Sequence, residues 1–190
     1  MNRRKALGSI LGLTGIGIVS YVGLKYVSGN SASNKGQLPK YLNLIAELVD
    51  VIIPPTETPG AKEAKVQDYI VDFMESCASN KEYNNFFNGL NDLQETCLNT
   101  YDASFENCTM EQKMVLLEDL DNNSGSNSLF SKINNKLRGR SFFNLLKTLT
   151  IEGYCTSELG TTVHLNYAPV PGKYEAITTI NTNQKAWATR

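Results

Sequence analysis

The sequence predicts an all-α fold, in which a single compact domain of about five helices precedes an irregular C-terminal segment rich in proline and tyrosine. Apolar residues recur at helical spacing along most of the chain. No two stretches of alternating apolar and polar residues face each other across a turn signal, so we expect no substantial sheet. If the first ~30 residues are a targeting segment, about 160 of the 190 residues remain, which suits one domain.

The N-terminus, residues 1–30, has the layout of an export signal. Arg3 and Arg4 precede an apolar run from Ala6 to about Leu24, and secretory signals place their charged and apolar regions in this order. Paired arginines before a glycine-rich, moderately apolar segment resemble a twin-arginine signal. The run is also close to the ~20 residues that span a bilayer. General secretion and an uncleaved membrane anchor therefore stay open as alternatives, and each reading places the body of the protein across the membrane.

The first two predicted helices are separated by a proline-rich turn. A polar linker at residues 31–38 leads into a helix over 39–53, which ends at the proline pair beginning with Pro54 because proline cannot continue the hydrogen-bond ladder. Residues 56–61 form a rigid turn. Apolar residues at helical spacing then predict a second helix over 62–77.

Further helices follow before the pattern changes. Thr109 and Gln112 have the spacing of a capping box, in which each side chain satisfies a backbone N–H at a helix start. Past Ile151 we expect at most a short helix near 157–165, opened by Thr156 or Ser157, and otherwise extended, irregular chain. The remaining helices are predicted at 80–99, 110–120 and 129–151, with a polar loop at 121–128.

Composition argues against several functions. The formal net charge is −1, and the only dense basic cluster lies at the N-terminus, so we expect no nucleic-acid-binding face. Four cysteines without a C-x-x-C pair, beside one histidine, argue against a zinc site. In an exported chain, Cys97 and Cys108 can close a short loop as a disulfide. Cys77 and Cys155 read as small buried apolar residues.

No catalytic constellation is visible. The single histidine, His164, has no nucleophile elbow beside it. Nucleotide-binding glycine motifs and haem-attachment motifs are absent. The acidic stretch 119–125 lacks the glycine and the final glutamate of a calcium-binding loop. We therefore expect no catalytic residue, metal site or cofactor on this chain.

Four ordered stretches together resemble the gluconate 2-dehydrogenase subunit 3 family. The first matches that family's I-I-P-x-T-x-T-P-G-A turn, and the last matches its closing motif. There are two departures: Cys155 stands where an aromatic residue is expected, and Ala176-Ile177 where many relatives carry Gly-Cys. The second departure argues against a disulfide from Cys77 to the C-terminal segment. The four stretches are Ile52–Ala61, Phe142–Gly160, Leu165–Tyr174 and Lys185–Thr189.

The resemblance implies a non-catalytic accessory subunit, formed by a helical small-subunit domain over residues 39–190. In such complexes a large flavin-binding subunit of the glucose-methanol-choline type oxidises a sugar or sugar acid. The small subunit binds it, supports its maturation and carries the export signal for both. FAD then belongs to the partner, and a cytochrome c subunit can take the electrons. The expected place is the periplasm, or the periplasmic face of the inner membrane. A stand-alone exported helical binding or scaffold protein is the alternative.

The proline-rich turn and the C-terminal segment are the candidate docking surface. A turn with three prolines and a glycine has little freedom to lose on binding. Aromatic residues with polar groups suit a surface that is apolar in the complex and wet in the free subunit. The alternative is that these aromatic residues only cap the helical core. The candidate interface residues are Pro54, Thr56, Pro59, Gly60, Tyr154, Tyr167, Pro171, Gly172, Tyr174 and Trp187.

Overall fold

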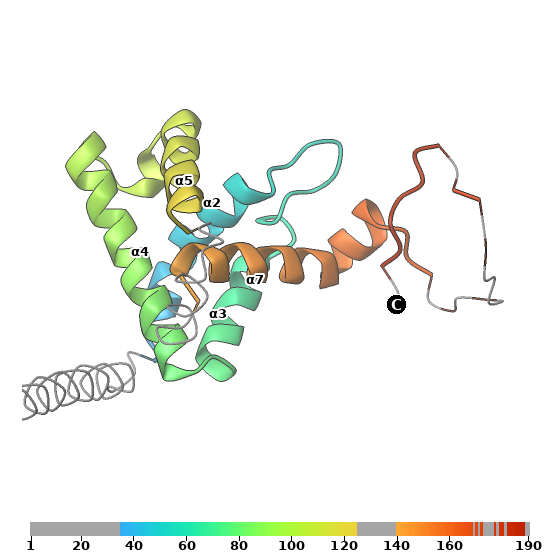
Figure 1. The fold of residues 1–190 in the computed structure, drawn as a ribbon, viewed down its shortest axis with the longest axis horizontal. Coiled ribbons are helices and arrows are strands. Elements are labelled where there is room, and N and C mark those ends of the chain that lie inside the picture. The colour runs from blue at the N-terminus through green and yellow to red at the C-terminus, as the bar shows by residue number, and fades with distance from the viewer. Residues whose placement is uncertain are drawn as a thin grey trace, which may run out of the picture.

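The computed structural model describes residues 35–124 and 140–168, and in the C-terminal segment residues 170, 172, 177, 179–180 and 182–188. Across these ranges all regular structure is helical, which confirms the predicted fold class (Figure 1). No helix in this part of the chain is both long and apolar enough to cross a bilayer. The expected signal or anchor, residues 1–30, lies outside the described residues.

The first helical segment begins at a proline, as predicted. A 3-10 turn, η1 (Leu38–Tyr41), carries Pro39 in its first turn and continues into α2 (Leu42–Ile52). At Ile53 the backbone leaves the helical region, and the two prolines that follow prevent the helix from resuming.

The second helix starts later than the predicted residue 62. Residues 61–65 form a turn that is closed by hydrogen bonds from Ala64 N to Gly60 O and from Val66 N to Ala61 O, both 3.1 Å long. Lys65 has a φ of 56°, a left-handed conformation that a right-handed helix excludes. As a result α3 runs from Val66 to Ser76.

Two capping boxes start the next long helices. Ser79 and Glu82 form one at the start of α4 (Asn80–Tyr101). The predicted pair at α5 (Met110–Ser124) is confirmed: Thr109 N donates to Gln112 Oε1 at 2.9 Å, and Gln112 N donates to Thr109 Oγ1 at 3.3 Å. A short 3-10 helix, η2 (Phe105–Asn107), connects α4 to α5.

The polar loop predicted from residue 121 begins later, because α5 continues through Ser124. Asp121 is held there by an ion pair with Lys147 of the last helix, whose Nζ lies 3.0 Å from its Oδ2. Tertiary contact thus overrides the low helix propensity of the Asp-Asn-Asn-Ser stretch. Residues 125–128 lie outside the described residues.

The last long helix, α7 (Phe142–Thr156), has Ser141 as its N-cap residue, and the helix does not extend to the residues before it. Ser141 has extended backbone angles, and its hydroxyl accepts a hydrogen bond from Asn144 N. A serine in this geometry is a helix N-cap, so the prediction of one helix over 129–151 is wrong at this point. Residues 129–139 lie outside the described residues.

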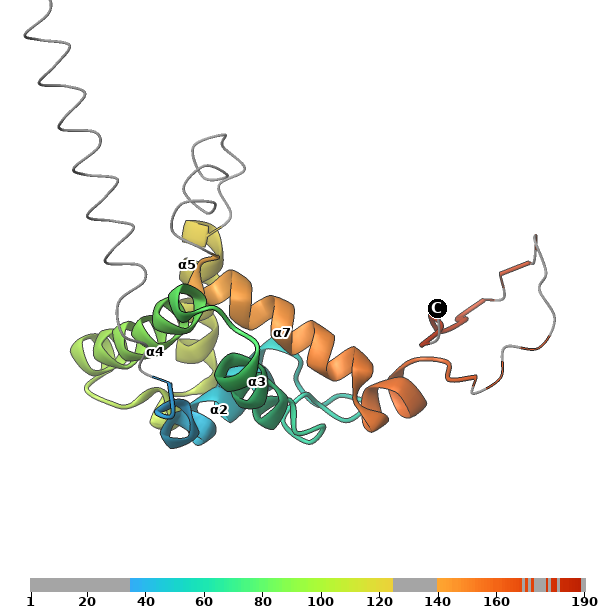
Figure 2. The same cartoon turned by 90° about the horizontal axis from the view of Figure 1, so that it is seen from below.

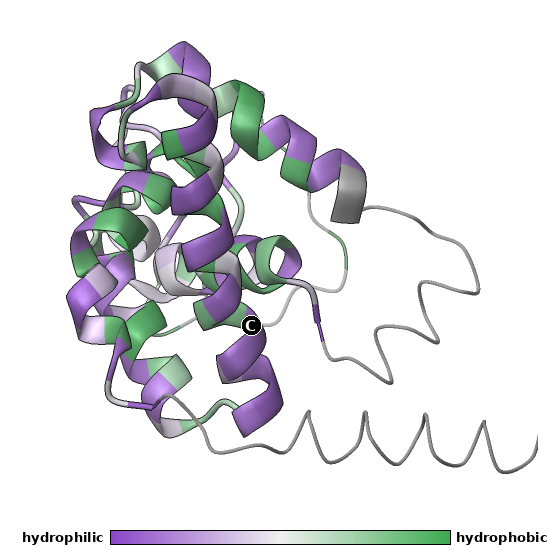
Figure 3. Ribbon diagram, turned by 90° about the vertical axis from the view of Figure 1, so that its left-hand side faces the viewer, coloured by the Kyte–Doolittle hydropathy of each residue, from purple (hydrophilic) through white to green (hydrophobic). Residues whose placement is uncertain are grey.

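Helix α7 is the centre of the fold. Figures 1 and 2 show it crossing the molecule with α3, α4 and α5 around it, and it also contacts α2. Figure 3 shows hydrophobic and hydrophilic positions alternating along the surrounding helices, as expected for elements that each bury one face. The buried residues of α7 are Phe142, Phe143, Leu145, Leu146, Leu149, Thr150, Gly153 and Tyr154.

A shared carboxylate fixes the edge of this core. Glu47 of α2 binds Lys62 at 2.6 Å and Lys113 of α5 at 2.7 Å. Hydrogen bonds from Lys113, and then from Lys62, lower the pKa of the Glu47 carboxyl below its ordinary value of 4.5. The Lys113 ammonium is almost fully buried and lies 5.5 Å from the centre of the Phe105 ring, a favourable cation–π arrangement.

We predict that Gly89→Ala destabilises the protein. A Cβ at Gly89 of α4 would lie 2.2 Å from Cγ of Phe142, and such overpacking typically costs about 1–3 kcal/mol. Chemical denaturation should show this loss even though alanine favours helix. The control is Asn88→Ala at the neighbouring exposed position, which should leave stability unchanged or raise it slightly. Equal stability of the two variants would contradict close packing of α4 on α7.

Candidate partner-docking site

The proline-rich turn is held in one shape by its own backbone. Ala61 N donates to Ile53 O at 2.9 Å across the base of the turn, and Thr56 N donates to Thr58 O at 3.0 Å near its tip. Gly60 is required here, because a Cβ would lie 2.8 Å from Pro55 N. The prolines and these hydrogen bonds together make a stiff, protruding turn.

Tyr154 of α7 anchors this turn from its buried side. Its side chain is only 3% exposed, and its hydroxyl donates a 2.7 Å hydrogen bond to the carbonyl of Pro59. The same ring meets His164 edge-on, with ring centres 5.6 Å apart. A single side chain of α7 therefore contacts both the turn and the chain that follows α7, segments that lie far apart in the sequence.

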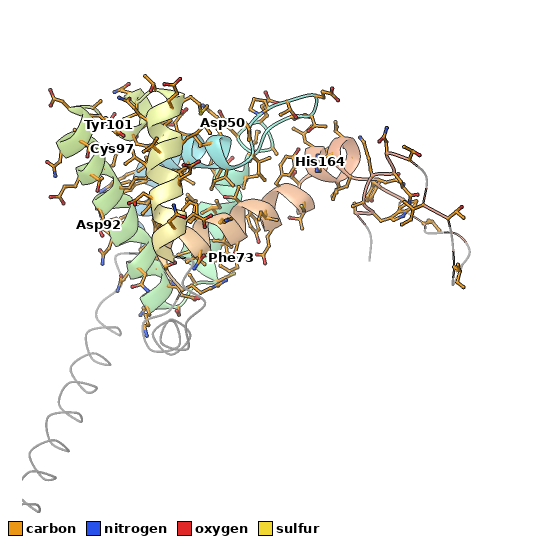
Figure 4. All side chains as sticks on the ribbon, turned by 45° about the horizontal axis from the view of Figure 1, so that its top comes forward. Asp50, Phe73, Asp92, Cys97, Tyr101 and His164 are labelled. Atoms are coloured by element: carbon orange, nitrogen blue, oxygen red, sulfur yellow. The ribbon has the colours of Figure 1, made fainter. Side chains whose placement is uncertain are left out.

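The end of α7 turns sharply at Ser157. The Ser157 hydroxyl donates to Tyr154 O at 2.7 Å and accepts from Gly160 N at 3.0 Å. A short π-helix, η3 (Gly160–His164), follows, with Leu159 as its N-cap residue and no side-chain cap. The short helix predicted near 157–165 is therefore present, but it begins later than the predicted Thr156 or Ser157. Figure 4 shows His164 at this end of the molecule, well away from Cys97 and Tyr101 on α4.

Beyond η3 the chain forms an arm that is closed at its base. Asn166 N donates to Ala186 O at 2.8 Å, and Ala188 N donates to Asn166 O at 3.0 Å, so that Asn166 and Trp187 form a parallel bridge. Lys185 Nζ donates to the carbonyl of Val163. The described residues between 166 and 187 lie outside the helical body, and Figures 1 and 2 show them projecting beyond α7. We call this segment the arm.

The arm carries apolar groups in water. Tyr167 is 50% exposed and Trp187 is 55% exposed, although both lie next to the bridge that closes the base. Apolar side chains on a projecting segment, away from the core, mark a candidate interaction site. The other large apolar residues exposed on the described part of the arm are Val170, Ile177 and Ile180.

The structure brings part of the predicted interface together. Pro59, Gly60 and Tyr154 meet at the anchor of the turn, with Tyr154 acting from the buried side. Pro171 and Tyr174 lie outside the described residues, as do Arg3 and Arg4. The predicted residues that are exposed are Pro54, Thr56, Tyr167, Gly172 and Trp187.

Sequence reasoning missed a second apolar surface on α5. Met110, Met114 and Val115 are each at least half exposed. Of these, Met114 also lines a groove of about 240 Å³ between α2, α5 and α7, together with Asp121 and Lys147. The signal was present in the sequence, since residues 110–120 carry apolar side chains on more than one helical face.

The described residues hold few groups with reactive potential. No cluster of three histidine, cysteine or acidic side chains suited to a metal ion occurs within the described ranges. No disulfide joins the four cysteines in this structure. Cys77 is exposed and Cys155 is half-buried, so the expectation that both are buried is wrong. The Ser157 hydroxyl lies near the histidine in sequence, but it is committed to the backbone of α7 and η3. The most prominent surface features of the described residues are a stiff turn and an apolar arm.

Fold and site thus define a small helical protein with a stiff turn and a projecting apolar arm. The family model described as Gluconate 2-dehydrogenase subunit 3 matches residues 39–172, and the chain belongs to that family. The match includes the turn, all described helices from α2 to η3, and the first residues of the arm. Neither the comparison with curated proteins nor the comparison with solved structures found a match.

We predict that Tyr154→Phe loosens the turn while the core stays intact. The substitution keeps the ring but leaves the Pro59 carbonyl without its 2.7 Å donor, at a cost of about 1 kcal/mol. Hydrogen exchange at the amides of Thr56 and Ala61 should become faster, because these amides bond within the turn. Tyr167→Phe on the exposed arm is the matched control. It should change neither the stability of the protein nor the exchange rates at these two amides. Unchanged exchange rates in Tyr154→Phe would show that the backbone hydrogen bonds within the turn are enough to keep its shape.

Proposed function

We propose that this chain is a non-catalytic accessory subunit that binds, helps mature and co-exports a FAD-dependent sugar or sugar-acid dehydrogenase of the glucose-methanol-choline type. Membership of a family described as a dehydrogenase subunit supports an accessory role in such a complex. The binding, maturation and export steps are our extension of that membership, and the first of them has a candidate surface on this chain.

The observation that carries the binding proposal is the shared anchor of the turn and the arm. Tyr154 holds the turn through Pro59 and contacts His164, the last residue of η3, just before the arm. A partner that meets this end of the molecule finds two protruding elements in a fixed relation. Preorganised elements lose little freedom on binding, so more of the contact energy appears as affinity.

The arm supplies the apolar part of the contact. Trp187 and Tyr167 are rigid aromatic side chains next to a closed backbone bridge. Burying such groups against a partner removes apolar surface from water at about 25 cal/mol per Å². Aromatic residues in this position are the usual hot spots of protein interfaces.

In this proposal the complex as a whole determines where the flavin is bound, which group accepts the electrons and where the protein works. FAD is held by the large subunit, and a cytochrome c subunit can take the electrons. The complex works in the periplasm or at the periplasmic face of the inner membrane, held there through residues 1–30 if they stay uncleaved. A flavoprotein that already holds its cofactor must cross folded, and a twin-arginine signal on a bound small subunit allows this.

We predict that Trp187→Ala weakens association with the flavoprotein subunit. The bridge to Asn166 uses only backbone atoms of Ala186 and Ala188, so the substitution removes the side chain and keeps the arm closed. Loss of a hot-spot aromatic residue typically costs ~2 kcal/mol, or about thirtyfold in affinity. The measurement is the dissociation constant of the purified subunits, together with the melting temperature of the variant.

The control is Leu98→Ala, which truncates a side chain of similar exposure, 53%, on α4. Figure 1 shows α4 on the far side of the helical body from the arm. The control variant should bind normally. If Trp187→Ala melts early and binds normally when folded, Trp187 belongs to the core and the arm is not the docking site. If the unmodified small subunit also fails to bind the flavoprotein, the result favours the alternative of a stand-alone exported binding or scaffold protein.

We predict that changing both Arg3 and Arg4 to Lys leaves this protein and its partner in the cytoplasm. The twin-arginine route reads the arginine pair itself, so the conservative change preserves charge but removes the signal. Cell fractionation with antibodies against both subunits measures the outcome. Replacing Lys5 by Arg keeps the pair intact and serves as the control. Export of the double variant at the normal level would rule out the twin-arginine route.

A further inference from the structure

Two of the four cysteines meet at the junction between α4 and α5. Cys97, near the end of α4, is fully buried, and Cys108, which follows η2, is 7% exposed. Both residues belong to the same buried cluster, and the Cys108 thiol is near enough to raise the pKa of the Cys97 thiol. The Cys108 thiol also donates to Ser104 O at 3.4 Å. Cys77 and Cys155, in contrast, lie at the ends of α3 and α7.

We propose that Cys97 and Cys108 form a disulfide when the chain folds in the presence of a low-molecular-weight disulfide such as oxidised glutathione. The Cys108 thiolate attacks one sulfur of the reagent and releases a small thiol. The Cys97 thiolate then attacks the Cys108 sulfur of the mixed disulfide and releases the second small thiol. The two protein thiols give up two protons and two electrons, and the reagent's S–S bond is reduced to two thiols.

The environment of Cys97 sets when this exchange happens. Burial, followed by the neighbouring Cys108, raises the pKa of the Cys97 thiol to about 12. Because the thiolate is the nucleophile, Cys97 in the closed core is almost unreactive at neutral pH. Exchange therefore takes place while the core is still open during folding. Once the core closes, the bond is shielded from reductants by the same burial.

The crosslink would hold the start of α5 on the end of α4. In the described structure this junction contains only η2 and the turns beside it. Leu117 of α5 lies in the hydrophobic core, and Leu116 and Leu120 pack against it. Ion pairs of Lys113 with Glu47 and of Asp121 with Lys147 also hold the helix. A bond immediately before the Thr109 capping box would fix where α5 begins, and with it the exposed apolar surface of Met110 and Met114.

The test refolds the full reduced chain with mixtures of reduced and oxidised glutathione, blocks the remaining thiols with an alkylating reagent, and digests the product with a protease that cleaves after glutamate. Glu106 lies between the two cysteines, and Glu95 and Glu111 flank them. Cleavage yields peptides 96–106 and 107–111, which stay joined in a mass spectrum only if Cys97 is bonded to Cys108. We expect the joined pair, with Cys77 and Cys155 alkylated.

Stability gives a second readout. Closing a loop of this length should raise the melting temperature of the oxidised chain over the reduced chain by roughly 5–10 °C. Cys77→Ser combined with Cys155→Ser should keep this difference, and Cys97→Ala should abolish it. Complete alkylation of Cys97 and Cys108 after oxidative refolding to a helical product would overturn the proposal, as would pairing of Cys108 with Cys77 or Cys155. Neither readout requires a partner subunit, so the result is separate from that of the docking proposal.

Discussion

The rest of the structure depends on the burial of α7. This helix packs against α2, α3, α4 and α5, and its first two residues, Phe142 and Phe143, are already in the core. Close approach to α4 is possible only because Gly89 leaves room for the Phe142 side chain. A helix enclosed in this way has few alternative positions, since close-packed interiors do not deform gradually. Its two ends are therefore fixed points for the segments attached to them.

The candidate docking site is built on one of those fixed ends. Tyr154 belongs to the buried set of α7, yet its hydroxyl reaches Pro59 and its ring reaches His164. Because Tyr154 belongs to both the core and the candidate site, the close packing of the core also fixes the positions of Pro59 and His164. This arrangement also explains why a chain without a visible catalytic constellation has such well-ordered local geometry around the turn. The order fixes the shape of the candidate docking surface.

Much of the fold follows from local sequence signals. The capping pair Thr109–Gln112, the helix-ending prolines and the spacing of apolar residues predict α2, α4 and α5 to within a few residues at most ends. What local signals could not predict depends on contacts distant in sequence or on single backbone angles. Lys65 takes a left-handed conformation that delays α3. Likewise, the sequence predicts the turn and the C-terminal segment as a docking surface, but it does not predict the bond from Tyr154 to Pro59. That bond joins residues 95 positions apart, and such a contact produces no periodic pattern in the sequence.

The bridge between Asn166 and Trp187, together with the Tyr154 anchor, gives the two protruding elements the character of a bivalent ligand. When one element touches a partner, the second is already held nearby at a high effective concentration, so its association becomes an intramolecular event. Two contacts that are individually weak can then give a long-lived complex through avidity alone. In the proposed complex, loss of the 2.7 Å bond from Tyr154 to Pro59 would loosen the turn relative to the arm and so shorten the residence time of the partner.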